Sequence, residues 1–337
     1  MSTFLHELRT RATKGYMRTI IFPESNDRRV LQAAQILAQE KIAKPLLVCS
    51  HEDIPKVQAL GLNYVEIDEE RARVLEKLLL ELRSSKAGTK DELTPESARA
   101  LSHDPLFYGM YLLRLGESDG LVAGAVRTTA EVLRAGLWLV GKAEGIQTVS
   151  SAMYMIVPAF RGGEGDRVIT FSDCAVVPLP TSEQLADIAI AAADARSAIV
   201  GDVPRVALLS YSTKGSGGNS GVSITVVRKA LELVRSRRPE LCIDGELQAD
   251  AALVPSIAER KNPGTVIVGN ANVLVFPSLD AANIAYKLVE NCVPEAQALG
   301  PILQGMQKPM SDLSRGVQAD DIVRIATIVA SQVTKRG

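Results

Sequence analysis

Short apolar runs rich in β-branched residues alternate with longer amphipathic segments along almost the whole chain. Runs of this kind predict strands that are buried on both faces, and the amphipathic segments between them predict helices that cover the sheet. The predicted strands are Thr19–Phe22, Leu46–Cys49, Gly120–Val126, Thr148–Val157, Val168–Phe171, Val206–Ser210, Val266–Val268, Val273–Phe276 and Ala298–Leu303. The predicted helices are Asp27–Gln39, Ala130–Val140, Glu183–Ala195, Ser223–Arg237, Ala281–Glu290 and Asp320–Val333. The alternation predicts an α/β fold with mostly parallel sheets.

Two of the predicted helices begin at capping signals. Thr128 is followed three residues later by Glu131, and Thr181 by Gln184, which is the spacing of a capping box. The first fifteen residues spread basic side chains through an amphipathic segment without the apolar stretch and cleavage site of an export signal. We therefore expect a first helix there and a cytoplasmic protein.

The chain has 337 residues, which is more than one hydrophobic core usually organises. Gly141–Gly145 and Pro294–Gln297 interrupt the periodicity and are the candidate crossings between domains. We expect a discontinuous first domain of residues 1–143 and 297–337 and a second domain of residues 144–296.

Charge, cysteine and histidine content exclude several kinds of partner. The chain has 38 Lys and Arg against 39 Asp and Glu, so no overall charge attracts nucleic acid or an anionic membrane. No apolar run reaches the roughly 20 residues that a membrane span needs. The four cysteines are far apart and the three histidines have no metal-binding spacing, so we expect neither a disulfide framework nor a metal site.

A glycine-rich segment, Lys214–Gly221, follows a predicted strand and precedes a predicted helix. Turns of this kind can bind anions through free amide groups and the helix dipole. The segment lacks the third glycine of the dinucleotide-binding signature, and no Gly-Lys-Ser/Thr closes it as in a Walker A loop. An anion-facing loop and a plain connection both remain open.

Two further clusters combine hydroxyl, guanidinium and carboxylate groups. The first is Gly124–Thr129 with Arg134 on the following helix, and the second is Asp312–Gly316 with Asp321 in the first turn of the last helix. Hydroxyls and amides at a helix N-terminus suit a phosphate, and a guanidinium on the same helix can face the same ligand. The alternatives are a helix cap with a surface arginine, and a turn followed by an acid that favours the helix dipole.

These clusters lie in segments that match one family in order along the chain. The matching segments are FPESNDRRVLQAA, DGLVAGAVRTTAEVLRAGL, TVSSAMYMIVP, FSDCAVVPLPTSEQLADIA, VALLSYSTKGSG, IDGELQADAA, ANVLVFPSLDAANIAYK and GPILQGMQKPMSDLSRG. On these residues the chain resembles phosphate acetyltransferases (phosphotransacetylases), in the short form that lacks an N-terminal regulatory region.

The resemblance implies a fold and a reaction. It implies two α/β domains similar to those of isocitrate and isopropylmalate dehydrogenases, with the active-site cleft between them, and a homodimer. The implied reaction is the reversible transfer of acetyl between acetyl phosphate and coenzyme A, with inorganic phosphate as the other product. Coenzyme A is then a substrate, and no tightly bound cofactor or metal is implied.

The resemblance also implies catalytic roles for three residues. Asp321 matches the family's proposed base, which raises the thiolate fraction of a thiol whose ordinary pKa is about 8.5. Ser314 matches the residue that stabilises the oxyanion of the tetrahedral intermediate. Arg315 matches the arginine that orients the base and holds the phosphoryl group, for which a planar guanidinium is suited.

Five other residues are candidate ligand contacts. Arg134 and Arg83 match arginines that hold coenzyme A, and Thr128, Thr129 and Ser151 are candidate contacts to acetyl phosphate.

The chain departs from the family at Arg127, where a histidine is usual and where the added charge could change anion affinity. Related activities stay open. A phosphate butyryltransferase, or a broader short-chain phosphate acyltransferase, would share thiol attack on an acyl phosphate. Cys174 could carry the acetyl group covalently, although a buried cysteine is more often a small hydrophobic residue. A metal- and NAD-dependent hydroxyacid dehydrogenase and a coenzyme A-binding protein without catalysis are the remaining alternatives.

Overall fold

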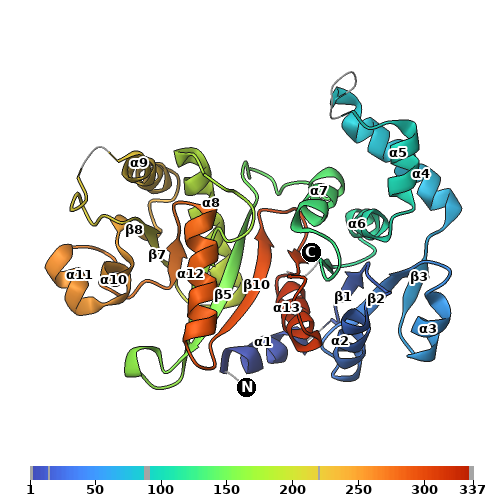
Figure 1. Cartoon of the computed structure of the whole chain (residues 1–337), viewed down its shortest axis with the longest axis horizontal. Coiled ribbons are helices and arrows are strands. Elements are labelled where there is room, and N and C mark those ends of the chain that lie inside the picture. The colour runs from blue at the N-terminus through green and yellow to red at the C-terminus, as the bar shows by residue number, and fades with distance from the viewer. Residues whose placement is uncertain (1–2, 14–15, 87–91, 219–220, 334–337) are drawn as a thin grey trace. The chain divides into compact units, whose positions relative to one another are not determined.

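The computed structural model describes residues 3–13, 16–86, 92–218 and 221–333 and divides the chain into two units of α/β structure (Figure 1). Unit 1 comprises Met1–His6 and Gly145–Gly305, and unit 2 comprises Glu7–Glu144 and Met306–Gly337. A crossing after His6 was not expected, since residues 1–6 were assigned to the other domain. The first of the two expected crossings lies one residue after the expected position. The second lies after residue 305 instead of 296, because the strand at 297–304 pairs with a strand of unit 1.

Unit 2 contains the first strands and the last helix of the chain, drawn in blue and red in Figure 1. Its strands are β1 (Thr19–Phe22), β2 (Lys44–Cys49), β3 (Tyr64–Glu66), β4 (Gly120–Ala123) and β11 (Met310–Asp312). Its helices are α2 (Arg28–Gln39), α3 (Ile54–Ala59), α4 (Glu69–Arg83), α5 (Pro95–Ser102), α6 (Pro105–Leu115), α7 (Thr129–Leu139) and α13 (Ala319–Ser331). The predicted first helix is α1 (Thr3–Thr13), which crosses the boundary between the units.

The strands of unit 2 run in the order β3-β2-β1-β4-β11, and every pair is parallel. Helices α6 and α13 cover opposite faces of this sheet. A Cβ at Gly109 of α6 would be 3.0 Å from Ile21, whereas a Cβ at Gly120 would be close to Val329 of α13 and to Ile20. Because Ile20 and Ile21 are neighbours on one strand, their side chains point to opposite faces.

Unit 1 contains a mixed sheet. Its strands are β5 (Ser150–Pro158), β6 (Asp166–Ser172), β7 (Arg205–Leu209), β8 (Cys242–Leu247), β9 (Val273–Val275) and β10 (Gln297–Gln304). Its helices are α8 (Ser182–Ile199), α9 (Val222–Arg237), α10 (Ala249–Leu253), α11 (Pro255–Lys261) and α12 (Leu279–Cys292). The order is β10-β5-β6-β9-β7-β8, with antiparallel pairs only at β10–β5 and β5–β6 among the described residues.

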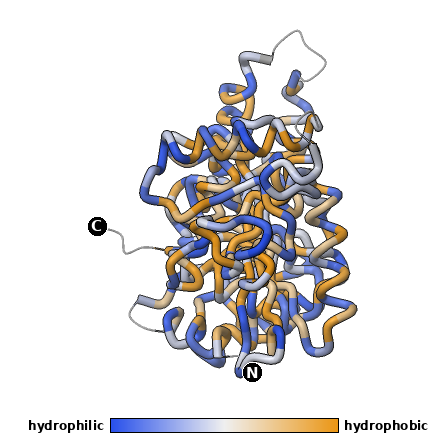
Figure 2. The backbone as a smooth tube through the Cα atoms, turned by 90° about the vertical axis from the view of Figure 1, so that its left-hand side faces the viewer, coloured by the Kyte–Doolittle hydropathy of each residue, from blue (hydrophilic) through white to orange (hydrophobic). Residues whose placement is uncertain are grey.

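Successive residues of β7 supply two different cores in unit 1. Ala207 and Leu209 pack with α12, whereas Val206 and Leu208 pack with α8 and α9. Hydrophobic and hydrophilic residues alternate along the helices, as Figure 2 shows, so that one side of each amphipathic helix can be buried. No helix in the described ranges combines the length and the apolar character that a membrane span needs.

Most predicted elements are confirmed within a few residues, including both capping boxes. The strand predicted at Val266–Val268 is wrong: Ile267 is buried, but Val266 and Val268 are exposed and the segment is a loop. Strand β8 was not predicted because it carries two buried carboxylates, Asp244 and Glu246, in place of apolar side chains. Helix α6 was not predicted because it is buried along most of its circumference and lacks a polar stripe.

Removal of the cap at Thr181 tests whether sequence-encoded helix starts stabilise unit 1. The Thr181 hydroxyl accepts the N–H of Gln184 at 3.2 Å. We expect Thr181→Ala to lower the free energy of unfolding by about 1 kcal/mol, because a backbone donor loses its partner. Urea denaturation measures the loss, and Thr181→Ser serves as the control that keeps the oxygen. Equal midpoints for the Ala and Ser variants would contradict the expectation.

Candidate active site

Polar residues follow three neighbouring parallel strands of unit 2 where each strand ends. Glu24 follows β1, the Gly124–Thr129 loop follows β4, and Asp312 ends β11. Because the carboxyl ends of parallel strands meet at one edge of a sheet, these segments lie together, and this edge is where open α/β sheets bind ligands. The two hydroxyl-and-guanidinium clusters recognised in the sequence are therefore neighbours.

The Glu24 carboxylate organises the β4–α7 loop. Its oxygens accept the backbone N–H groups of Gly124, Ala125, Val126 and Arg127 at distances from 2.8 to 3.2 Å. The side chain is only 4% exposed, so these bonds compensate for the desolvation of the carboxylate. This role of Glu24 was not predicted from the sequence, although a carboxylate directly after a predicted strand is a visible signal.

Gly124 is required by the close approach of two strand ends. Its φ of +109° lies in the region that disfavours side chains, and a Cβ there would collide with the Asp312 carboxylate and the backbone of Leu313. The loop after β4 and the end of β11 are thus in backbone contact.

The Arg29 guanidinium connects three loops of the site. It donates to the carbonyls of Arg315 at 2.7 Å, Val317 at 3.0 Å and Ala125 at 2.9 Å. It also pairs with Asp27, the N-cap of α2, at 2.8 Å, and this partner lowers the pKa of the Asp27 carboxyl. Arg29 therefore fixes the backbone that carries Arg315, the predicted catalytic arginine. This role of Arg29 was not predicted from the sequence.

Asp312 and Thr129 form a short hydrogen bond between β11 and the start of α7. The Thr129 hydroxyl lies 2.5 Å from Asp312 Oδ2, and the Asp312 residue is 1% exposed. Burial, together with the negative charge of Glu24, raises the pKa of Asp312 to about 6. Thr128 beside it is exposed and is the N-cap of α7.

The predicted catalytic residues lie on the loop after β11 and on the first turn of α13. Ser314 and Arg315 are exposed. The Asp321 carboxylate is 39% exposed, accepts the backbone N–H of Gln318 at 3.1 Å and pairs with Arg324 at 3.0 Å. A carboxylate has about four acceptor positions, so these two bonds leave Asp321 able to accept a further proton donor.

The two arginines predicted to hold coenzyme A lie at one aromatic ring. The Arg83 guanidinium lies 4.4 Å and that of Arg134 5.8 Å from the centre of the Trp138 ring. Arg83 ends α4, and the other two residues lie on α7. Trp138 is the one tryptophan of the sequence. Its place in the site was not predicted, since a single aromatic residue on a helix does not indicate a ligand contact.

The charge of Arg127 is neutralised within unit 2. Its guanidinium pairs with Asp104 at 2.7 Å and with Glu131 at 3.3 Å. We therefore correct the expectation that this departure from the family adds a free positive charge for an anion.

Ser151 lies in unit 1, whereas the site residues described above belong to unit 2. It is fully buried, and its hydroxyl donates to Asp173 Oδ1 at 2.5 Å. The same carboxylate accepts the backbone N–H groups of Ala175 and Val177. This burial favours a structural role for Ser151 and gives no support to a contact with acetyl phosphate.

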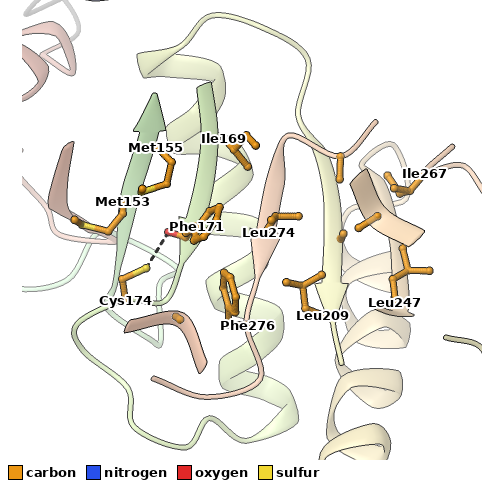
Figure 3. Packing of buried hydrophobic residues seen from close by; sticks show 14 of the residues in the cluster. Met153, Met155, Ile169, Phe171, Cys174, Leu209, Leu247, Ile267, Leu274 and Phe276 are labelled. Atoms are coloured by element: carbon orange, nitrogen blue, oxygen red, sulfur yellow. Dashed lines mark hydrogen bonds between the residues drawn. The ribbon is translucent and has the colours of Figure 1, made fainter. Parts of the chain in front are cut away.

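Cys174 is part of the apolar core of unit 1 (Figure 3). The residue is 1% exposed, and its thiol donates to the carbonyl of Phe171 at 3.3 Å. Burial raises the pKa of the thiol strongly, so the nucleophilic thiolate is suppressed. These properties argue against the covalent alternative.

The glycine-rich loop binds a carboxylate of its own unit. Glu246, 1% exposed, accepts the N–H of Gly215 at 2.7 Å, the hydroxyl of Ser212 at 3.1 Å and the guanidinium of Arg228 at 2.7 Å. The part of the loop at 219–220 lies outside the described residues. Since the Glu246 carboxylate occupies the Gly215 amide at the start of the loop, that amide is not open to a phosphate. Within the described ranges, no group of three or more His, Cys, Asp or Glu side chains could hold a metal.

Known proteins resemble this chain over nearly its full length. A family model described as phosphate acetyl/butaryl transferase matches residues 3–330. The phosphate acetyltransferase of Acetivibrio thermocellus is 42% identical over 335 residues, which cover 98% of each chain. The phosphotransacetylase structure from Streptococcus pyogenes superimposes with a TM-score of 0.87 at 34% identity and covers 99% of both chains. A 4-hydroxythreonine-4-phosphate dehydrogenase from Klebsiella pneumoniae, 10% identical over 95% of this chain and 99% of its own, has a TM-score of 0.54 and shares the fold alone.

Substitution of Asp312 tests whether burial keeps its carboxyl protonated at higher pH than in the unfolded chain. The unfolded chain releases this proton near the ordinary pKa of 3.8, whereas the folded chain holds it up to about pH 6. Stability therefore falls as pH rises through this window. We expect Asp312→Asn to raise the free energy of unfolding at pH 8 by on the order of 2 kcal/mol, with a much smaller gain at pH 4.

Denaturant unfolding at the two pH values measures this difference. Asp320→Asn removes an exposed carboxylate from the first turn of α13 and is the matched control. A gain at pH 8 no larger than that at pH 4 would contradict the raised pKa.

Proposed function

Because the chain belongs to the phosphate acetyl/butaryl transferase family and is an acyltransferase with phosphate acetyltransferase activity, we propose that it transfers acetyl in one direct step at the edge of the unit 2 sheet. The sulfur of coenzyme A attacks the carbonyl carbon of acetyl phosphate, and the bond from that carbon to the phosphate oxygen breaks. The observation that carries this proposal is the Asp312–Thr129 bond, because it ties the loop of Ser314 and Arg315 to the N-terminus of α7.

Asp321 serves as the base in this proposal. It takes the thiol proton as the sulfur attacks, so that acetyl-coenzyme A and inorganic phosphate form without a covalent enzyme intermediate. Its half-exposed carboxylate on the first turn of α13 supports the assignment, since a base must reach the substrate directly. The backbone N–H of Gln318 and the guanidinium of Arg324 fix its orientation.

Ser314 and Arg315 stabilise charge in this proposal. The Ser314 hydroxyl donates to the oxygen that becomes negative in the tetrahedral intermediate, and Arg315 binds the phosphoryl oxygens and the leaving phosphate. Their exposure supports contact with substrate. The bonds from Arg29 to the carbonyls of Arg315 and Val317 support a fixed position for the loop.

Coenzyme A is held by Arg83 and Arg134 in this proposal, whereas Thr128 and Thr129 contact acetyl phosphate. Helix N-terminal hydroxyls and amides suit a phosphoryl group, and guanidinium groups suit the phosphates of coenzyme A. The Trp138 ring beside both arginines gives the site an intrinsic fluorescence reporter. We further propose a cytoplasmic homodimer that needs no tightly bound cofactor.

A thioester-absorbance assay with acetyl phosphate and coenzyme A tests the proposed function. We expect turnover without added metal or NAD, and a preference for acetyl over butyryl phosphate. One additional methylene changes binding by only about 1–3 kcal/mol, so some activity with propionyl phosphate is expected. A preference for butyryl phosphate would identify the alternative acyl specificity, and absence of any thioester would contradict the proposal.

Replacement of Arg315 separates transition-state stabilisation from binding. We expect Arg315→Lys to lower kcat about 10²–10³-fold while the KM for coenzyme A changes little, because an ammonium cannot reproduce the planar pair of donors. Steady-state kinetics with both substrates measure the two constants. Arg73→Lys, an exposed substitution on α4, is the control. A variant that changed only the KM for coenzyme A would make Arg315 a binding residue instead.

Replacement of Asp321 tests the base. We expect Asp321→Asn to lower kcat about 10²-fold or more at pH 7, and to cost less at pH 9, where the thiolate of coenzyme A forms unaided. A kcat profile from pH 6.5 to pH 9.5 measures the recovery, with Asp320→Asn as the neighbouring control. An equal defect at every pH would remove the base role from Asp321.

A further inference from the structure

Asp312 has an unused acceptor inside the site. Its Oδ2 is bonded to the Thr129 hydroxyl, whereas its buried Oδ1 has no hydrogen-bond partner among the described residues. An ionised carboxylate in this position would leave a desolvated charge whose Oδ1 atom has no donor to compensate it within the described part of the chain.

Glu24 explains why Asp312 has no other donors. Four backbone N–H groups of the Gly124–Arg127 stretch point to Glu24, so none of these is bonded to the second carboxylate nearby. The negative charge of Glu24 disfavours ionisation of Asp312, which receives fewer hydrogen bonds than Glu24 does. Asp312 is thus the protonatable member of this pair.

The other charged groups on the adjoining elements have partners of their own. On α7, Glu131 pairs with Arg127, and Arg134 lies over Trp138. On α13, Asp321 pairs with Arg324, and Asp320 is exposed. At the start of α2, Arg29 pairs with Asp27. In the loop after β1, Glu24 acts on Asp312 as a like charge.

We propose that Asp312 is a positioning residue that couples anion binding at Thr129 to the uptake of one proton. This inference rests on the proposed function, which makes Thr129 a ligand of the phosphoryl group. It adds that protonation of Asp312 reverses the direction of the hydrogen bond between Thr129 and Asp312.

The direction of that bond follows from donor and acceptor chemistry. An ionised Asp312 can only accept, so the Thr129 proton points to it and the hydroxyl cannot donate to an anion. A protonated Asp312 donates its own proton to Thr129 Oγ1, which frees the hydroxyl proton for a phosphoryl oxygen. The added proton comes from solvent and forms an O–H bond on the Asp312 carboxyl, and no bond between heavier atoms changes. Anions therefore bind the protonated form more tightly, and binding draws in a proton.

Sulfate is the probe for the test, because it remains a dianion throughout the pH range while phosphate titrates. Isothermal titration calorimetry of sulfate in two buffers of different ionisation enthalpy gives the affinity and the proton uptake at each pH. For the unmodified chain we expect uptake approaching one proton near pH 7. Above the pKa of about 6, the apparent dissociation constant should rise by up to tenfold per pH unit.

Two sets of variants give the decisive results. Asp312→Asn donates permanently to Thr129, so it should bind sulfate with nearly constant affinity from pH 6 to pH 8.5 and take up no proton. Asp320→Asn should behave like the unmodified chain. Thr129→Val should weaken binding several-fold at pH 6 and abolish the uptake, and Thr129→Ser should restore both, which keeps the test decisive if the Asp312 variant does not fold.

The inference is overturned if the unmodified chain takes up no proton, or if Asp312→Asn or Thr129→Val takes up as much as the unmodified chain does. These measurements do not use turnover. A failed coupling together with an intact thioester assay therefore overturns this inference and leaves the proposed function standing.

Discussion

The Glu24 carboxylate is the constraint on which the site depends. It gathers the N–H groups of the β4–α7 loop, and this fixes the entry into α7 and the position of Thr128 and Thr129. The close approach at Gly124 then brings the end of β11 against this loop. A buried carboxylate that receives several backbone donors is held firmly, because each lost bond would leave a desolvated polar group.

Unit 1 uses the same physical device in its own glycine-rich loop. There Glu246 collects an amide, a hydroxyl and a guanidinium, and these donors hold its pKa at about 2 in spite of burial. In contrast, Asp312 receives few donors and its pKa rises. Glu246 and Asp312 thus differ in how far their hydrogen-bond donors offset the desolvation that disfavours ionisation of both carboxyls.

The residues of the candidate site differ in their freedom to act. Ser314 and Arg315 are exposed side chains on a backbone held by Arg29, which combines access with a fixed position. Such support from neighbouring groups is what gives a reacting side chain a defined geometry. Cys174 lies in the opposite situation, with its thiol enclosed by the apolar core of unit 1. Burial therefore distinguishes the exposed candidate catalytic residues from Cys174, whose thiol could otherwise act as a nucleophile.

The sequence by itself determined the α/β class, most strands and helices, both capping boxes and the two clusters that carry the candidate catalytic residues, because periodicity and capping act over a few neighbouring residues. It did not give β8, the second unit boundary, or the roles of Glu24 and Arg29. Only the tertiary structure decided that Ser151 is buried, that Arg127 is neutralised and that Asp312 Oδ1 has no donor among the described residues. The reason is that burial and hydrogen-bond supply depend on which segments meet in the fold. The partners are 22 positions away for Ser151 and Asp173, 23 for Arg127 and Asp104, and 183 for Thr129 and Asp312, and no local pattern records which of them meet.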